Sequence, residues 1–274
     1  MTRADVIQPL DGDLRDTDVL DVRWNLGQEA GAGRAAYLLG HIAGARFLDL
    51  DAVLVGPGAD PTLGRHPLPG VAQLETGLGK LALDPSRPVV VYDVPGSYAA
   101  GRAWWVLTWA GFHVRVLDGG WPAWVASGRA VSDGPVADPV PTTLSLTVGH
   151  LPTITACQAA AWPGTLIDAR AAERYRGDVE PLDAKAGHIP GAVNRPVTGF
   201  WADDGTLRSD DVLCERLGDL RDPVACYCGS GVSAAQIILA LAALDVPASL
   251  YPPSWSGWSA DPTHAVTTGA GEDV

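Results

Sequence analysis

Residues 223–244 read PVACYCGSGVSAAQIILALAAL, and this stretch decides the fold. Its first part, residues 223–227, is a short apolar run that predicts a buried strand ending at Cys228. After the loop GSGV, apolar residues recur at positions 234, 237, 238, 241 and 244, which is the spacing of one face of a helix. Ser233 has the residue type of a helix N-cap. The stretch therefore predicts a strand, a tight turn and a helix that packs on a core.

Other segments of the chain repeat this alternation of strand and helix. Short apolar runs rich in Val, Leu and Ile occupy residues 88–92, 114–117 and 165–167, and segments with helical spacing lie between such runs. Continuous apolar strands separated by helices are typical of a parallel sheet that is buried on both faces. We therefore expect an α/β fold.

The second half of the chain repeats motifs of the first half. The matching pairs are VLDVRW (19–24) with LIDAR (166–170), GHIAGA (40–45) with GHIPGA (187–192), and VRVLDGGWPAW (114–124) with SLYPPSWSGW (249–258). His41 and His188 lie 147 positions apart, whereas Asp93 and Cys228 lie 135 apart. Two constant offsets with one length change between them indicate an internal duplication.

The length of the chain agrees with two copies of one fold. A domain of average size has roughly 100–200 residues, so 274 residues suggest two domains. Residues 129–152 are rich in proline and have no helical periodicity, which predicts an extended linker. We predict one domain over residues 1–138 and a second over residues 139–274.

Composition and charge narrow the classes of function. The chain is 47% hydrophobic and 19% charged, which supports packed cores, and its net charge of -13 disfavours nucleic acids and anionic membranes as partners. Residues 1–16 lack the basic and apolar regions of a signal peptide, and the apolar run 237–244 is shorter than the roughly 18 residues of a membrane span. We expect a cytoplasmic protein whose four cysteines are reduced thiols.

Cys228 stands where a cysteine can be made reactive. Gly229 and Gly231 allow a tight turn whose N–H groups point inward, and the start of the following helix adds a partial positive charge. These features together favour the thiolate form and predict a nucleophilic cysteine. The alternative is a buried cysteine at a strand end, with a glycine loop that serves only to reverse the chain.

The other cysteines lack this context. We expect Cys157 and Cys214 to be packed in the core, and Cys226, in the pattern C-x-C, has no second Cys/His pair at the spacing of a zinc site. A cysteine-dependent phosphatase would need an arginine six residues after its cysteine, where this chain has Ala234. A phosphatase is therefore excluded, and no metal is expected.

The GHIxGA motifs, the segments VLDGGWPAW and WSGW, and above all CGSGVSA resemble the two-domain rhodanese-like sulfurtransferases. The resemblance extends from about residue 19 to residue 266. It implies two tandem rhodanese-like domains, each a mainly parallel sheet with helices on both faces. It also implies a first domain without the cysteine, where Asp93 stands in its place, and a second domain that carries sulfur as a persulfide on Cys228. No metal or organic cofactor is implied.

Within this family, the CGSGV loop resembles that of the 3-mercaptopyruvate sulfurtransferases, whereas thiosulfate-specific members place basic residues after the cysteine. Gly229 and Ser230 carry no charge, which favours mercaptopyruvate over the thiosulfate dianion. We expect ping-pong transfer of sulfur to cyanide or a thiol, such as that of a thioredoxin-like protein. The alternatives are a thiosulfate:cyanide sulfurtransferase and a persulfide carrier or sensor that does not turn over small donors.

The resemblance also implies roles for residues around Cys228. Ser230, His66 in RHPLPG and Asp51 in FLDLD match a serine, histidine and aspartate that assist proton transfer, although from the sequence alone His66 could be an exposed loop residue. The N–H groups of the loop are expected to hold the persulfide and the donor. The loop residues concerned are Gly229, Gly231, Val232 and Ser233.

Arg174 in ERYRG matches the first of two arginines that hold the donor's carboxylate. The position of the second falls at or near Asp183, so Lys185 or Arg176 is a candidate substitute. Tyr98 matches a tyrosine that faces the cleft between the domains, with core packing as the alternative. The residues repeated in both halves are expected to be structural, namely Arg23, His41, Arg170 and His188.

Overall fold

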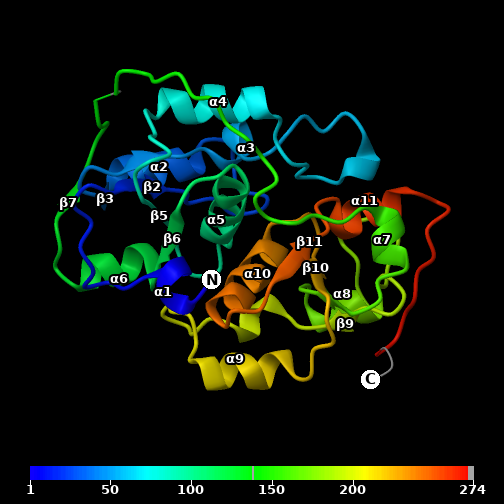
Figure 1. The fold of residues 1–274 in the computed structure, drawn as a ribbon. Helices are drawn as coiled ribbons and strands as arrows, with labels where there is room; N and C mark the ends of the chain where they lie inside the picture. The colour runs from blue at the N-terminus through cyan, green and yellow to red at the C-terminus, as the bar shows by residue number, and fades with distance from the viewer. Residues whose placement is uncertain (138, 271–274) are drawn as a thin grey trace. The chain divides into compact units, whose positions relative to one another are not determined.

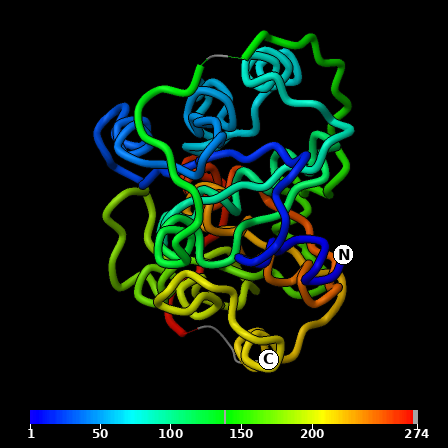
Figure 2. Tube along the Cα trace, turned by 90° about the vertical axis from the view of Figure 1, so that its left-hand side faces the viewer, coloured from blue at the N-terminus to red at the C-terminus, as the bar shows by residue number. Residues whose placement is uncertain are grey.

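The computed structural model describes residues 1–137 and 139–270 (Figure 1). By their contacts the residues form two compact units, and Figure 2 traces the same chain from blue to red. Unit 1 comprises Met1–Gly56, Leu68–Leu151 and Trp201–Leu207, and unit 2 comprises Pro57–Pro67, Pro152–Phe200 and Arg208–Val274. The units follow the two halves of the chain except that each includes one short segment of the other half. The predicted domains over residues 1–138 and 139–274 stay a prediction.

Unit 1 is built on a five-stranded sheet in the order β1-β6-β5-β2-β4, in which every neighbouring pair is parallel. Strands β3 and β7 form a separate antiparallel pair, and β7 lies at the start of the predicted linker. The strands of unit 1 are β1 (Ile7–Gln8), β2 (Asp18–Asp21), β3 (His41–Ile42), β4 (Arg46–Phe47), β5 (Val89–Tyr92), β6 (Val114–Leu117) and β7 (Val131–Ser132).

Helices cover the sheet of unit 1, and Figure 1 shows α4 and α6 on opposite sides of its strands. Helix α5 packs against β5 and β6, and its Trp104 and Trp105 are fully buried. The helices of unit 1 are α1 (Arg3–Val6), α2 (Ala32–Leu39), α3 (Leu50–Val53), α4 (Val71–Lys80), α5 (Ala99–Trp109) and α6 (Gly120–Ala126).

Unit 2 contains a four-stranded sheet in the order β11-β10-β8-β9, and all of its pairs are parallel. Helix α10 packs against β10 and β11. The strands are β8 (Thr165–Asp168), β9 (Val193–Asn194), β10 (Val224–Tyr227) and β11 (Ala248–Leu250). The helices are η1 (Pro61–Leu63), α7 (Ala156–Ala160), α8 (Ala172–Arg176), η2 (Val197–Gly199), α9 (Asp210–Leu217), α10 (Ser233–Ala243) and α11 (Ser254–Ala260).

The two sheets confirm the duplication and the predicted α/β class. The order β6-β5-β2-β4 in unit 1 corresponds to β11-β10-β8-β9 in unit 2. Arg23 pairs with Asp21 at 2.6 Å in unit 1, and Arg170 pairs with Asp168 at 2.6 Å in unit 2. Each guanidinium also donates to the carbonyl of the glycine that opens the repeated GHI motif. The repeated arginines are therefore structural, as predicted.

The repeated histidines are structural too. His41 stacks on Tyr37 with ring centroids 4.0 Å apart, and His188 stacks on Tyr175 at 3.7 Å. In each case Nδ1 lies within hydrogen-bond distance of the carbonyl oxygen of the stacked tyrosine, at 2.9 Å and 2.8 Å. Burial lowers the pKa of His188, which favours the neutral ring.

The structure corrects two local expectations. Cys157 and Cys214 are exposed rather than packed in the core, because the residue that α7 buries is Ala159 and the residues that α9 buries are Leu213 and Leu217. Helix α10 begins at Ser233, so the N-cap position belongs to the preceding residue of the loop. Among the described residues, no helix is long and apolar enough to cross a membrane.

Candidate active site

Cys228 follows β10 directly and lies at the carboxyl end of this inner strand of the unit 2 sheet. All four residues of β10 are buried, and Cys228 itself is only 1% exposed. The N–H of Cys228 donates to Ser254 Oγ at 3.2 Å, and its carbonyl accepts from the N–H of Trp255 at 2.9 Å. Both partners belong to α11, so that helix fixes the backbone that carries the thiol.

The loop after Cys228 turns its backbone toward the sulfur. The N–H of Gly231 donates to Cys228 Sγ at 3.1 Å. Gly231 has φ +83°, a left-handed conformation that favours glycine. Helix α10 begins two residues later, and the N-terminus of a helix carries a partial positive charge. The sulfur therefore accepts one backbone N–H in a loop that leads directly into a helix N-terminus.

Cys226, two residues earlier, has a different environment. It is fully buried within β10, and this burial raises the pKa of its thiol. A protonated, inaccessible thiol is a poor nucleophile. Among the described residues, no group of three or more His, Cys, Asp or Glu side chains could hold a metal ion.

Ser230, two residues after Cys228, meets His66. His66 Nδ1 lies 2.7 Å from Ser230 Oγ, and the two residues are 8% and 6% exposed. His66 is therefore not a solvent-exposed loop histidine. It comes from residues 57–67, which belong to unit 2 although the rest of residues 1–151 forms unit 1.

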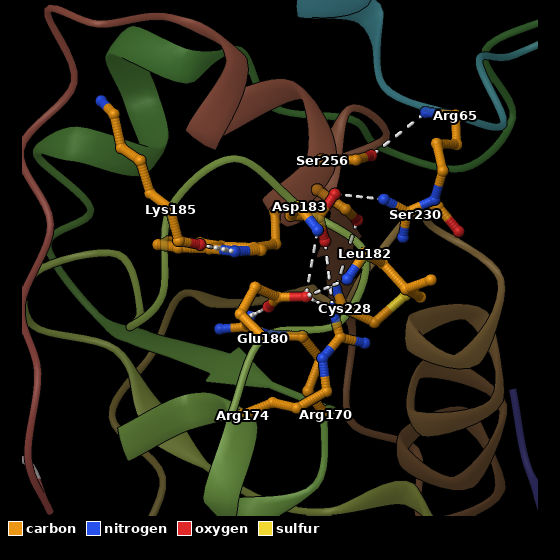
Figure 3. A network of polar contacts seen from close by, with 12 residues as sticks. Arg65, Arg170, Arg174, Glu180, Leu182, Asp183, Lys185, Cys228, Ser230 and Ser256 are labelled. Atoms are coloured by element: carbon orange, nitrogen blue, oxygen red, sulfur yellow. Dashed lines mark hydrogen bonds and ion pairs between the residues drawn. The ribbon is translucent and has the colours of Figure 1, made fainter. Parts of the chain in front are cut away.

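Close backbone packing holds this segment against α11. Gly64 has φ +80°, and a Cβ built on it would lie 2.4 Å from the carbonyl oxygen of Pro253. A Cβ on Gly257 would lie 2.5 Å from the carbonyl oxygen of Thr62. The N–H of Arg65 donates to Ser256 Oγ at 3.1 Å, as Figure 3 shows. Two glycines thus permit the approach that brings His66 to the loop.

Arg174, in the middle of the short helix α8, approaches the same loop. Its Nη1 is 3.5 Å from the position that a Cβ on Gly229 would occupy. Its Nη2 donates to Glu180 Oε1 at 2.7 Å and to Asp183 Oδ2 at 3.0 Å. The residue predicted to hold an anionic donor therefore does lie beside the loop that follows Cys228, but two carboxylates already pair with it.

Arg65 is a residue that the sequence analysis missed. Its guanidinium pairs with Asp183 Oδ1, and its Nη2 lies 3.2 Å from the same Cβ position on Gly229. Arg65 is therefore the second cation at the loop. The candidates for that role have other contacts, since Lys185 donates to the carbonyls of Asp261 and His264 and Arg176 pairs with Asp178. The signal for Arg65 in the sequence was its position beside His66 in RHPLPG.

Asp51 and Tyr98 belong to unit 1, and their roles at the site stay predictions. Asp51 Oδ2 accepts a hydrogen bond from Trp24 Nε1 at 2.9 Å. Tyr98 precedes α5 with φ +63°, and burial raises the pKa of its hydroxyl.

Comparisons with known proteins agree with the fold. The family model for the rhodanese-like domain matches residues 2–127 and 154–261. The chain is 46% identical over 263 residues to a putative thiosulfate sulfurtransferase, SseB, from Mycobacterium tuberculosis, covering 92% of this chain and 90% of the relative. It is 40% identical over 271 residues to a probable 3-mercaptopyruvate sulfurtransferase from Pseudomonas aeruginosa, covering 92% of both.

A solved structure is similar over the whole fold. The 3-mercaptopyruvate sulfotransferase SseA from Escherichia coli superposes with a TM-score of 0.80 at 30% identity, over 93% of this chain and 99% of that one. Two matched domains and relatives of this similarity settle the family. The chain therefore belongs to the rhodanese-like family, as a sulfurtransferase built from two rhodanese-like domains.

Proposed function

We propose that this sulfurtransferase takes sulfur from 3-mercaptopyruvate and passes it to a thiol or to cyanide through a persulfide on Cys228. The observation that carries the proposal is the N–H of Gly231 directed at Cys228 Sγ, next to the buried pair of Ser230 and His66. An anion-stabilising loop suits a sulfur that is a thiolate before transfer and a persulfide anion after it. The adjacent hydroxyl and imidazole suit a donor that carries a proton on its sulfur.

In the first half-reaction, the Cys228 thiolate attacks the sulfur of mercaptopyruvate. A sulfur–sulfur bond forms, the carbon–sulfur bond breaks, and its electron pair leaves on carbon as the enolate of pyruvate. The proton of the donor thiol passes through Ser230 and His66 and is returned to the enolate carbon, which gives pyruvate. Asp51 is proposed to orient His66, Tyr98 to contact the donor, and Arg174 to bind the donor's carboxylate.

In the second half-reaction, the acceptor attacks the outer sulfur of the persulfide. The sulfur–sulfur bond breaks, its electron pair returns to Cys228 as the thiolate, and the acceptor leaves as a persulfide or as thiocyanate. The N–H groups of the loop from Gly229 to Ser233 support the anion in both half-reactions. A thioredoxin-like protein as acceptor and a cytoplasmic location form part of the proposal, and both suit a chain whose four cysteines are all free thiols.

Thiosulfate is the second candidate donor, because one specific observation favours it. Arg65 and Arg174 both approach Gly229, so the cations that the loop itself lacks are supplied by other segments. Attack on thiosulfate would release sulfite and leave the same persulfide, with no proton to move.

Steady-state assays with each donor at equal concentration test the assignment. We expect a higher kcat/KM with mercaptopyruvate, and a clear preference for thiosulfate would reverse it. Mass spectrometry after incubation with each donor separates an enzyme from a persulfide carrier. The enzyme gains one sulfur on Cys228 from a small donor and loses it when thiol is added, whereas a carrier gains none.

A further inference from the structure

The two guanidinium groups that approach the catalytic loop are bridged by one buried carboxylate. Asp183 Oδ1 pairs with Arg65, and Asp183 Oδ2 accepts from Arg174 Nη2 at 3.0 Å. Figure 3 shows Asp183 between the two arginines, with dashed lines to both. The side chain of Asp183 is only 4% exposed. Both of its oxygens are thus directed at the cations that line the site.

Glu180 adds a second carboxylate, but its contacts are distributed differently. Its Oε1 accepts from Arg174 at 2.7 Å and from the N–H groups of Leu182 and Asp183, and its Oε2 pairs with Arg170 at 3.4 Å. Glu180 therefore joins the site to the structural pair of Arg170 and its partner aspartate. Asp183 is the carboxylate that spans the two arginines at Gly229.

The cluster carries no net charge. Its cations are Arg65, Arg170 and Arg174, and its anions are Asp168, Glu180 and Asp183. The positive charges of the two arginines at the loop are thus balanced by carboxylates within the same cluster. The Nε atoms of Arg65 and Arg174 are nevertheless buried without a hydrogen-bond partner among the described residues. Each of these two arginines thus keeps one N–H without an acceptor in the described part of the chain, while its charge is compensated within the cluster.

We propose that Asp183 is a specificity-determining residue, an internal carboxylate that competes with donor anions for Arg65 and Arg174 and penalises dianions more than monoanions. This inference rests on the proposed function in that the donor is a small anion bound beside Cys228. Each negative charge on the donor meets the negative charge of Asp183 in a site of low exposure, where screening is weak. Mercaptopyruvate with its single carboxylate is therefore tolerated better than thiosulfate.

The substitution Asp183→Asn keeps the shape of the side chain and removes its charge. We expect kcat/KM to rise for both donors, and the ratio of thiosulfate to mercaptopyruvate to rise by on the order of tenfold. The matched control is Asp178→Asn, which removes a charge from the same segment but from the exposed pair with Arg176. An unchanged ratio in folded Asp183→Asn overturns the proposal.

A second measurement does not depend on turnover. Alkylation of Cys228 by iodoacetate, an anion, is compared with alkylation by neutral iodoacetamide, and peptide mass spectrometry resolves each cysteine. We expect the iodoacetate-to-iodoacetamide rate ratio at Cys228 to rise about tenfold in Asp183→Asn and to stay constant at the exposed Cys214. If the iodoacetate-to-iodoacetamide ratio at Cys228 is unchanged, the role of Asp183 is contradicted, whether or not the protein turns over a donor. If that ratio rises but the protein turns over neither mercaptopyruvate nor thiosulfate, only the proposed function is contradicted.

Two further variants guard against misfolding. Asp183→Ala also removes the charge of Asp183. Of the two neutral variants, Asp183→Asn and Asp183→Ala, the one that melts cooperatively is assayed. Arg65→Met acts in the opposite direction, because loss of the guanidinium leaves the carboxylate of Asp183 in excess. The side chain of Arg65 is 30% exposed, so its replacement removes little buried packing. We expect the iodoacetate-to-iodoacetamide ratio at Cys228 to fall in this variant. A rise in that ratio contradicts the proposal.

Discussion

His66 Nδ1 lies 2.7 Å from Ser230 Oγ although the two residues are 164 positions apart in the sequence. The contact exists because residues 57–67 leave the fold of unit 1 and pack in unit 2 through Gly64 and Gly257. A histidine from the first half of the chain thereby contacts the loop that follows Cys228. The pair of His66 and Ser230 is suited to moving a proton. Some sulfur donors carry a proton on the transferred sulfur and others do not.

Removal of this pair should affect the two donors differently. We expect Ser230→Ala and His66→Gln each to slow persulfide formation from mercaptopyruvate by about 10²-fold, the usual contribution of a positioned acid or base. Thiosulfate carries no proton on its outer sulfur, so its rate should fall much less. Single-turnover measurements with each donor test this prediction. Equal losses with both donors would show that the pair only supports the loop structure.

The cysteines should separate clearly by substitution. We expect Cys228→Ser to abolish both persulfide formation and turnover, because a hydroxyl at this position is not ionised near neutral pH. Cys226→Val should retain turnover, since Cys226 is fully buried in β10 and burial raises the pKa of its thiol. Mass spectrometry of each variant after incubation with donor is the measurement, with Cys214→Ser as a surface control. Sulfur retained on the Cys228→Ser protein would refute the assignment.

The sequence predicted the parts of the fold that rest on periodicity and repetition. The run at residues 223–244 forms β10 and α10, and the offsets of the GHI motifs correspond to two sheets with the same strand order. It did not predict the ion pairs of Arg65 with Asp183, or the exposure of Cys157, because these depend on which segments pack together in space. Sequence spacing carries no information about a loop from one half that packs in the other half's unit.

The buried pair of Arg170 and Asp168 should contribute strongly to stability. Arg170 also donates to the carbonyl of Gly187, so its loss leaves a buried carboxylate and a buried carbonyl without their partner. We expect Arg170→Met to destabilise the protein by about 3–5 kcal/mol. The control Arg176→Met breaks the exposed pair with Asp178 and should cost no more than about 1 kcal/mol. Urea unfolding of both variants measures the two losses of stability. Equal losses would refute the structural role of Arg170.

Asp93, which stands in unit 1 where Cys228 stands in unit 2, should make stability depend on pH. Burial raises the pKa of Asp93 to about 6 from 3.8, although the N–H of Ala100 donates to its carboxylate at 2.8 Å. Between these values the folded protein binds a proton that the unfolded chain has released, so stability is lost as pH rises through the window.

The variant Asp93→Asn removes this loss while its amide oxygen can still accept from Ala100. Relative to the unsubstituted protein, we expect the variant to gain stability progressively between about pH 4 and pH 6, reaching on the order of 3 kcal/mol near neutral pH. Urea unfolding across this range is the measurement. The control is Asp84→Asn, because hydrogen bonds from Ser86 lower the pKa of Asp84 and its loss should act in the opposite direction. A stability difference that does not change with pH would mean that Asp93 titrates alike in the folded and unfolded states, and that burial does not control its charge.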